Sequence, residues 1–236
     1  MKQVFRVFWG CTLAAALALT GCGRGGAPGS SGAGSMSGSG SGAMSGGTAG
    51  QEQAWRTGLG VVTEAAGSDR AGKITTAAAA VVLDADGINA LSGHIDLLDA
   101  RRGRTTVLTP HEVEFARIGG DLSRGDRERA AQDFAMAHGC VLVLKGHRTD
   151  TASPEGDVLV NTTGGSGLAK GGSGDVLTGV IASLMAQRAD ALRAAAVGVW
   201  LHGRAGDLAE QELTAYSVTP EDVVRKLPDA IREILE

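Results

Sequence analysis

From residue 77 onward, the chain alternates short apolar runs with longer segments in which apolar residues recur at helical spacing. Short runs bounded by polar or turn-forming residues are typical of strands that are buried on both faces of a parallel sheet. The predicted strands are residues 77–83, 105–108 and 140–144. The predicted helices are residues 88–98, 124–138, 175–187, 191–211 and 220–234. Strands that alternate with helices predict an α/β fold with a mostly parallel sheet and helices on both of its faces.

Two further signals lie in the second half of this pattern. Residues 153–156, Ser-Pro-Glu-Gly, predict a tight turn that leads into a return strand at residues 158–160. Thr219, followed by Pro220 and Asp222, is a capping signal for the last helix. The apolar stripe of that helix indicates a surface that faces the core and comprises Val223, Leu227, Ile231 and Ile234.

A glycine-rich loop passes directly into the helix at residues 175–187. Gly171, Gly172 and Gly174 have no β-carbon, so their N–H groups can approach a ligand closely. The free N–H groups and the positive dipole end of the helix that begins near Asp175 form an anion site, for which phosphate is the natural ligand. Asp175 would repel that ligand unless it accepts a proton from a hydroxyl that attacks a phosphoryl group. The alternative is that Asp175 only favours the helix start and the glycines only make a turn.

Polar residues follow each predicted strand, at the sheet edge where ligands bind in open α/β folds. Asp84 and Asp86 follow the first strand. After the second, Thr109 is expected to cap a helix and Pro110 to occupy its first turn, which places His111 at the helix start. Lys145 leaves the third strand and, with the glycine after it, suits contact with a nucleotide phosphate or ribose. For His111 a structural or exposed role is the alternative, and for Lys145 a solvated turn.

The N-terminal part of the chain differs from ordinary globular sequence. Residues 1–22 carry two basic residues, an apolar run and Leu-Thr-Gly-Cys, a layout that resembles a lipoprotein signal in which Cys22 is lipidated. A buried Ala/Leu helix is the alternative. Residues 23–50 are nearly all Gly, Ser and Ala, which predicts a flexible tether. Residues 51–236 are then long enough for one domain.

Charge and cysteine content exclude some classes of function. A net charge of −4 without a basic cluster argues against nucleic acid as a partner. Of the three cysteines, two belong to the leader, and Cys140 lies among apolar residues as a core thiol, so no disulfide framework is expected.

Several motifs together resemble the ADP-dependent NAD(P)H-hydrate dehydratases over about two thirds of the chain. The matching segments are Val-Leu-Asp-Ala-Asp at residues 82–86, Leu-Thr-Pro-His at 108–111, Leu-Lys-Gly at 144–146, Asn-Thr-Thr-Gly at 161–164, Gly-Gly-Ser-Gly-Asp at 171–175 and the segment 201–207. The resemblance implies a ribokinase-like, three-layer αβα fold with a doubly wound sheet. It also implies restoration of NADH or NADPH from the 6-hydroxy hydrate, with ADP or ATP and Mg²⁺.

The resemblance implies a role for each site residue. Asp175 would contact the hydroxyl of the hydrate as base, and His111 and Gly47 would contact the same substrate. The nucleotide site would comprise Lys145, Gly146, His147, Arg148, Thr149, Gly171, Gly172, Ser173 and Gly174. Mg²⁺ would bridge the nucleotide phosphates, and no protein ligand set for a metal is expected. A homo-oligomer is the tendency of the family.

The chain departs from the family pattern in its N-terminal half. Residues 42–47 and 56–63 resemble remnants of two glycine-containing segments of the family, so part of the Gly/Ser tract is a candidate substrate loop. The strands that usually follow and a Gly-Pro-Gly-Leu-Gly loop are absent, and residues 64–76 stand in their place. Loss of a central strand exposes the edges of its neighbours, so we expect a fold that is truncated at its N-terminal side.

Three functions fit these observations. The first is a hydrate dehydratase, active or decayed; the second is a ribokinase-like kinase of a small molecule; the third is a non-catalytic, tethered nucleotide-binding protein. The leader predicts membrane anchoring outside the cytoplasm, whereas the chemistry of the domain predicts the cytoplasm. The sequence leaves this conflict open.

Overall fold

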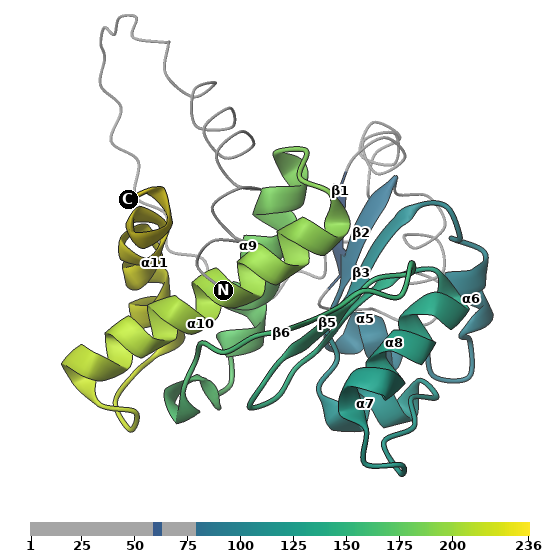
Figure 1. Cartoon of the computed structure of the whole chain (residues 1–236), viewed down its shortest axis with the longest axis horizontal. Helices are drawn as coiled ribbons and strands as arrows, with labels where there is room; N and C mark the ends of the chain where they lie inside the picture. The colour runs from purple at the N-terminus through teal and green to yellow at the C-terminus, as the bar shows by residue number, and fades with distance from the viewer. Residues whose placement is uncertain (1–58, 63–78) are drawn as a thin grey trace, which may run out of the picture. The chain divides into compact units, whose positions relative to one another are not determined.

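The computed structural model describes residues 59–62 and 79–236 of the chain (Figure 1). The predicted signal, the Gly/Ser-rich tether and the candidate substrate residue Gly47 lie outside these residues. Within the described helices, none is both long and apolar enough to cross a membrane.

The described residues form a six-stranded sheet whose spatial order follows the chain. The strands are β1 (Leu59–Val62), β2 (Ala80–Leu83), β3 (Thr105–Leu108), β4 (Val141–Leu144), β5 (Asp150–Ala152) and β6 (Val158–Val160). Strands β1 to β4 are parallel, and β5 and β6 return as antiparallel strands. A mostly parallel sheet and a strand at residues 105–108 are therefore confirmed.

The helices of the described residues divide between the two faces of the sheet. Their bounds are α5 (Asp86–Asn89), α6 (Asp96–Asp99), α7 (Glu112–Arg117), α8 (Arg127–His138), α9 (Ser173–Ala186), α10 (Ala191–Leu213) and α11 (Pro220–Leu235), with a 3-10 turn η1 (Ser166–Leu168). In Figure 1, α9 and α10 lie on one side of the sheet and α6, α7 and α8 on the other.

Alternate residues of each buried strand supply the two apolar cores. Leu142 and Leu144 of β4 pack with Phe115 of α7 and Phe134 of α8. The intervening Val141 and Val143 pack with Leu177 and Ile181 of α9 and with Ala194 of α10. Because successive side chains of a strand point to opposite faces, this arrangement requires apolar residues at every position and produces three layers, as expected.

Two predicted elements differ from the observed ones. The helix predicted at residues 88–98 is wrong: two short helices, α5 and α6, occupy this region, and Gly93 lies between them with φ +74°. That left-handed conformation breaks a helix. Strand β5 was not predicted because its sequence, Asp-Thr-Ala, has no apolar run, although all three residues are buried.

The end of the chain follows its sequence signal closely. Thr219 accepts a hydrogen bond from the backbone N–H of Asp222, whose carboxylate accepts one from the backbone N–H of Thr219. Of the predicted stripe, Val223 is buried and the other three residues are half-buried, since α11 packs on α10 at the periphery.

Cys140 is the core thiol expected: it is 2% exposed, and burial raises the pKa of its thiol to about 12.

The sheet continues at the point where the family pattern is shortened. β1 pairs with β2 in parallel register from Leu59 with Ala80 to Val62 with Leu83. The edge of β2 that loss of a strand was expected to expose is therefore covered within the described residues.

The contact between α9 and α10 predicts opposite effects for two glycine substitutions. A β-carbon at Gly198 would lie 2.7 Å from Cγ1 of Ile181, whereas one at Gly179 would meet nothing within 4 Å. We expect Gly198→Ala to lower the free energy of unfolding by about 1–3 kcal/mol through overpacking. Gly179→Ala, the matched control, should raise it by about 1 kcal/mol because alanine favours helix. Urea unfolding followed by circular dichroism measures both, and equal stability of the two variants would contradict this packing.

Candidate functional site

The ends of the parallel strands bring several sequence-predicted residues to one edge. The backbone N–H of Lys145 donates to the carbonyl of Pro110 at 2.8 Å, and His111 pairs with Lys145 as an isolated parallel bridge. The pairing of β3 with β4 thus extends past both strands. His111 and Lys145 lie side by side at the edge where the sequence predicts them.

A buried ion pair joins the ends of β2 and β4. Nζ of Lys145 lies 2.7 Å from Oδ1 of Asp84, and the hydroxyl of Thr178 in α9 donates to Oδ2 of Asp84 at 2.9 Å. The side chain of Asp84 is 2% exposed and that of Lys145 is 22% exposed. Burial opposes ionisation of Asp84, but the ammonium of Lys145 and the hydrogen bonds outweigh it and lower the pKa of this carboxyl. Asp84 is therefore an anion that orients Lys145.

His111 has a structural role, which the sequence left open as the alternative to a role at the site. It is the N-cap of α7 itself: its Nδ1 accepts from the backbone N–H of Val113 at 3.1 Å and of Glu114 at 3.3 Å. The carboxylate of Glu114 accepts from the backbone N–H of His111 at 2.8 Å, which completes a capping box. The prediction that Thr109 caps this helix and Pro110 occupies its first turn is wrong. The reason is that the His111 ring supplies the acceptor from a position two residues closer to the helix, while its side chain stays 53% exposed.

The glycine-rich loop delivers the start of α9 to this ion pair. α9 begins at Ser173, slightly before the predicted start, and Gly172 is its N-cap with φ +89°. A β-carbon at Gly174 would lie 3.4 Å from both Nζ of Lys145 and Oδ2 of Asp84. Among the described residues, no acceptor faces the backbone N–H groups of Gly174 and Asp175. A helix start with free N–H groups beside an ammonium is an anion site.

Asp175 is exposed in the first turn of α9. Its carboxylate is accessible from solvent beside the free N–H groups. This placement is compatible both with a base and with a residue that only favours the helix start.

The loop that precedes α9 is held by α10. Both carboxylate oxygens of Asp207 accept from the N–H of Gly164 at 3.1 Å, and Glu210 accepts from the N–H of Gly167. A β-carbon at Gly203 would lie 2.3 Å from Oγ1 of Thr163, so only glycine allows this approach. The segment 201–207 thus serves the loop, which explains why it accompanies the glycine motif.

His202 is a buried neutral imidazole beside the start of α9. It is 7% exposed, and burial lowers its pKa to about 4, although a hydrogen bond with the backbone of Ser173 opposes the shift. The nearby ammonium of Lys145 lowers the pKa further. Within the described residues, Nε2 of His202 has no hydrogen-bond partner. A second positive charge is therefore unfavourable at this position.

The turn between β4 and β5 contains the other predicted nucleotide residues. Gly146 and Thr149 bond across it: the hydroxyl of Thr149 accepts from the N–H of Gly146 and donates to its carbonyl, at 3.4 and 3.3 Å. His147 and Arg148 are exposed at its tip. Lys145 is the residue of this turn that reaches the start of α9. The described residues contain no cluster of three or more His, Cys, Asp or Glu arranged to hold a metal ion.

Sequence reasoning missed the residues that support this site. Asp84 was expected at the edge without a partner, and the roles of Thr178, His202, Asp207 and Glu210 were not predicted. A polar residue at a buried position of an apolar helix, such as Thr178 or His202, was the available signal. It marks burial but does not identify the partner.

An open α/β sheet with an anion-binding helix start and a strand-end lysine at one edge defines a class of nucleotide- or phosphate-handling proteins. The sequence model of the NAD(P)H-hydrate dehydratase family matches residues 42–229, and the chain belongs to this family. Among curated relatives, the ADP-dependent (S)-NAD(P)H-hydrate dehydratase of Neisseria meningitidis serogroup B is 42% identical over 164 residues. The match covers 67% of this chain and 55% of that relative, so the chain spans about half of its length.

Solved structures give the same fold. An ADP/ATP-dependent NAD(P)H-hydrate dehydratase of Bacillus subtilis, co-crystallised with ATP and Mg²⁺ and soaked with CoA, superposes with a TM-score of 0.63 and 28% identity. The match covers 76% of this chain and 66% of that one. A ribokinase-like superfamily protein of Enterococcus faecalis has a TM-score of 0.60 at 24% identity, over 75% and 63% of the two chains. The expected ribokinase-like fold is confirmed.

The depressed pKa of His202 predicts a loss of stability in acid. Since the pKa is about 4 in the folded chain and ordinarily 6.5, protons bind the unfolded chain first as pH falls. Stability is full above the ordinary pKa, and about 3 kcal/mol is lost between it and the folded-state pKa, at about 1.4 kcal/mol per unit. Urea unfolding at neutral pH and near pH 4 should show this loss in the wild type.

The variant His202→Gln should lose that component of the acid sensitivity, because it cannot titrate. His94→Gln, which changes an exposed histidine, is the control and should retain the wild-type pH dependence. Identical pH profiles for His202→Gln and the wild type would contradict the assignment.

Proposed function

We propose that this chain converts the hydrates of NADH and NADPH back to the reduced cofactors in a reaction that consumes ADP or ATP. The observation that carries this proposal is the start of α9, where the free N–H groups of Gly174 and Asp175 lie beside the Asp84–Lys145 pair. Family membership and the similarity to proteins named as NAD(P)H-hydrate dehydratases support the same reaction. The activity belongs to metabolite repair.

The geometry suggests a role for each part of the nucleotide site. The phosphates would lie at the start of α9, against Gly171, Gly172, Ser173 and Gly174. The ammonium of Lys145 is 22% exposed, so it can contact a phosphate while Asp84 holds it in place. The ribose and base would lie along Gly146, His147, Arg148 and Thr149, of which His147 and Arg148 are exposed.

Asp175 is the proposed catalytic base. Its exposed carboxylate would accept the proton of the 6-hydroxyl as that oxygen attacks the terminal phosphoryl group of the nucleotide. The bond between the phosphoryl group and the rest of the nucleotide breaks, which leaves AMP when ADP is consumed. The C–O bond then breaks as the lone pair of the ring nitrogen forms a C=N⁺ double bond, and inorganic phosphate departs. Loss of a proton from C5 of the ring then gives the neutral reduced nicotinamide. Phosphorylation thus turns hydroxide, a poor leaving group, into phosphate.

The residues at this edge fit a Mg²⁺ ion that the nucleotide brings with it. The described residues offer no cluster of carboxylates for a metal, and the carboxylate of Asp84 is already bonded to Lys145 and Thr178. Phosphate oxygens would therefore be its ligands, and it would neutralise their charge.

His111 and Gly47 are proposed contacts for the hydrate. The side chain of His111 is 53% exposed next to Lys145, so it can reach a substrate without losing its capping bonds. For Gly47 the support is the sequence resemblance of residues 42–47 alone.

The arrangement of the whole chain is proposed from sequence. Residues 1–22 would be a lipoprotein signal with a lipid anchor at Cys22, residues 23–50 a tether, and residues 51–236 the dehydratase domain, which would assemble as a homo-oligomer. The layout of the leader supports anchoring, whereas the substrates favour the cytoplasm. Metabolic labelling with a fatty acid, compared between wild type and Cys22→Ser, distinguishes the two locations.

The dehydratase activity predicts nucleotide-dependent formation of NADH. The full chain with hydrated NADH, ADP and Mg²⁺ should develop the near-ultraviolet absorbance of reduced nicotinamide. We expect Asp175→Asn to lower kcat by about 100-fold or more, because it removes the base. Asp157→Asn, at an exposed position of the hairpin turn, is the matched control and should retain activity.

Other outcomes identify the alternatives. ADP binding without NADH formation in folded protein would indicate a nucleotide-binding protein without this activity. Formation of ADP from ATP with an unphosphorylated small alcohol would indicate a kinase.

A further inference from the structure

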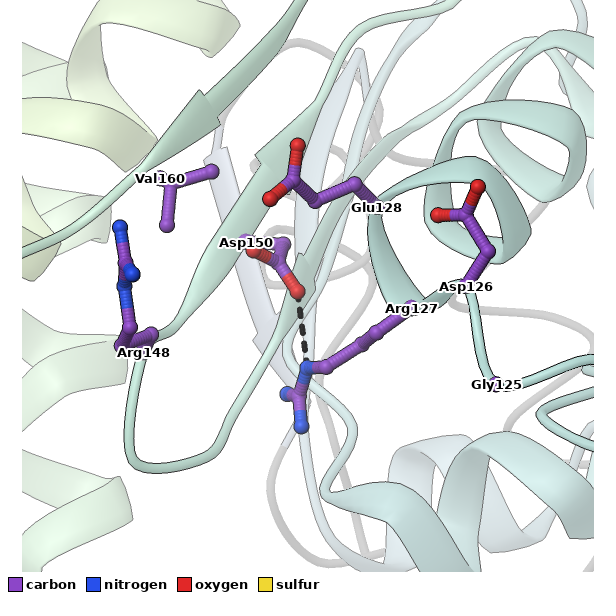
Figure 2. Close-up of a pocket in the computed structure, with 7 residues that line it drawn as sticks. All are labelled: Gly125, Asp126, Arg127, Glu128, Arg148, Asp150 and Val160. Carbon is purple, nitrogen blue, oxygen red and sulfur yellow. Dashed lines mark hydrogen bonds and ion pairs between the residues drawn. The ribbon is translucent and has the colours of Figure 1, made fainter.

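One arginine holds both ends of the turn between β4 and β5. Arg127 is the first residue of α8, and its Nε donates to Oδ2 of Asp150 at 2.8 Å, the pair that Figure 2 marks with a dashed line. Nη2 donates to the carbonyls of Leu144 at 2.6 Å and Lys145 at 2.9 Å. Nη1 pairs with Glu112 at the start of α7. The guanidinium thus bonds to the backbone where the turn begins and to the side chain where it ends.

In the ion pair of Arg127 with Asp150, the carboxylate is buried more deeply than the guanidinium. The side chain of Asp150 is 2% exposed, against 25% for Arg127. Burial raises the pKa of Asp150, and the hydrogen bond and charge of Arg127 offset this only in part. Asp150 therefore depends on Arg127 as the partner that makes its burial tolerable.

Gly146 is adapted to the arginine. A β-carbon at Gly146 would lie 2.5 Å from Nη1 and 2.7 Å from Nη2 of Arg127. The guanidinium therefore lies directly against the backbone of the turn. This contact gives a reason for glycine after Lys145 that is independent of any ligand.

Beside Arg127, the start of α8 and this turn border an open space. A cavity of about 380 Å³ lies there, as Figure 2 shows, lined by Gly125, Asp126, Arg127, Glu128, Arg148, Asp150 and Val160. Arg127 lines this space, and its bonds to Leu144, Lys145 and Asp150 connect α8 with both ends of the turn.

We propose that Arg127 is a positioning residue for the adenine nucleotide. Its bonds hold the backbone of residues 145–149 on the side of α8 and so direct Lys145 toward Asp84 and the start of α9. Arg127 itself does not touch the nucleotide. The inference rests on the proposed binding of nucleotide by this turn.

Calorimetric titration of the full chain with ADP tests the inference without requiring turnover. We expect Arg127→Met to raise the Kd for ADP by about 10- to 100-fold, because the turn is no longer fixed. The KM for ADP should rise in parallel, while the KM for the hydrate and kcat at saturating ADP stay near wild type. Arg129→Met is the matched control: Arg129 lies on the same helix, is exposed and pairs within it with Asp133, so ADP binding should be unchanged.

A second variant covers loss of folding. Arg127→Met leaves Asp150 as a buried carboxylate without its partner, which is strongly destabilising. Arg127→Met combined with Asp150→Asn removes that charge, should restore the unfolding midpoint, and should still bind ADP weakly. Recovery of wild-type affinity in this double variant would show that only stability was at stake and would overturn the inference.

A double-mutant cycle measures the coupling of two substitutions in ADP affinity, which general destabilisation does not change. Gly146→Ala should weaken ADP binding about tenfold in the wild type, where the methyl group displaces the guanidinium, and much less in Arg127→Met. Additive effects would contradict the contact.

The titration separates the inference from the proposed function. Wild-type protein that does not bind ADP would refute the nucleotide site, and the inference with it. Wild-type protein that binds ADP, together with an Arg127→Met variant of equal affinity, would refute the inference and leave the proposed function intact.

Discussion

The site depends on the buried ion pair between Asp84 and Lys145. Desolvation of two charges is costly, and the pair is tolerable only with short contacts and further hydrogen bonds. Both conditions are met, since the two side chains are 2.7 Å apart and Thr178 bonds the second oxygen of Asp84. β2, β4 and α9 must therefore adopt their native positions together. The position of these two strands in the sheet and the position of the first turns of α9 therefore depend on each other.

Carboxylates of α10 hold two backbone amides of the glycine-rich loop. Asp207 and Glu210 bond the N–H groups of Gly164 and Gly167 earlier in the glycine-rich loop. The N–H groups of Gly174 and Asp175 have no such partner among the described residues. The N–H group of Gly174 lies next to Lys145, at the start of α9. Arg127 on the other side of the sheet fixes the backbone from which Lys145 projects, so both halves of the site are held by residues away from it.

Sequence patterns predicted the helices and strands that are buried through apolar side chains. β3 and the start of α11 follow their sequence signals, because apolar runs and caps act locally. β5 was missed because Asp150 and Thr151 are buried through polar bonds, which have no periodic signature. The helix predicted at residues 88–98 failed at Gly93, where a left-handed turn divides two short helices. The glycine motif, His111 and Lys145 were expected at one edge of the sheet and lie there, whereas the residues that hold them were not predicted.

The sequence by itself determined the α/β class, the glycine-rich loop that leads into α9 and the gathering of polar residues at the carboxyl ends of the strands. These follow from spacing, since parallel strands end at one edge and a helix exposes its first N–H groups wherever it begins. Only the tertiary structure decided that Asp84 pairs with Lys145, that His202 is neutral, and that Arg127 lies against the backbone of Gly146. Each of these depends on residues from different elements, and the strength of their charges depends on burial. Neither the distance between two such residues nor their burial can be read from a fixed spacing along the chain.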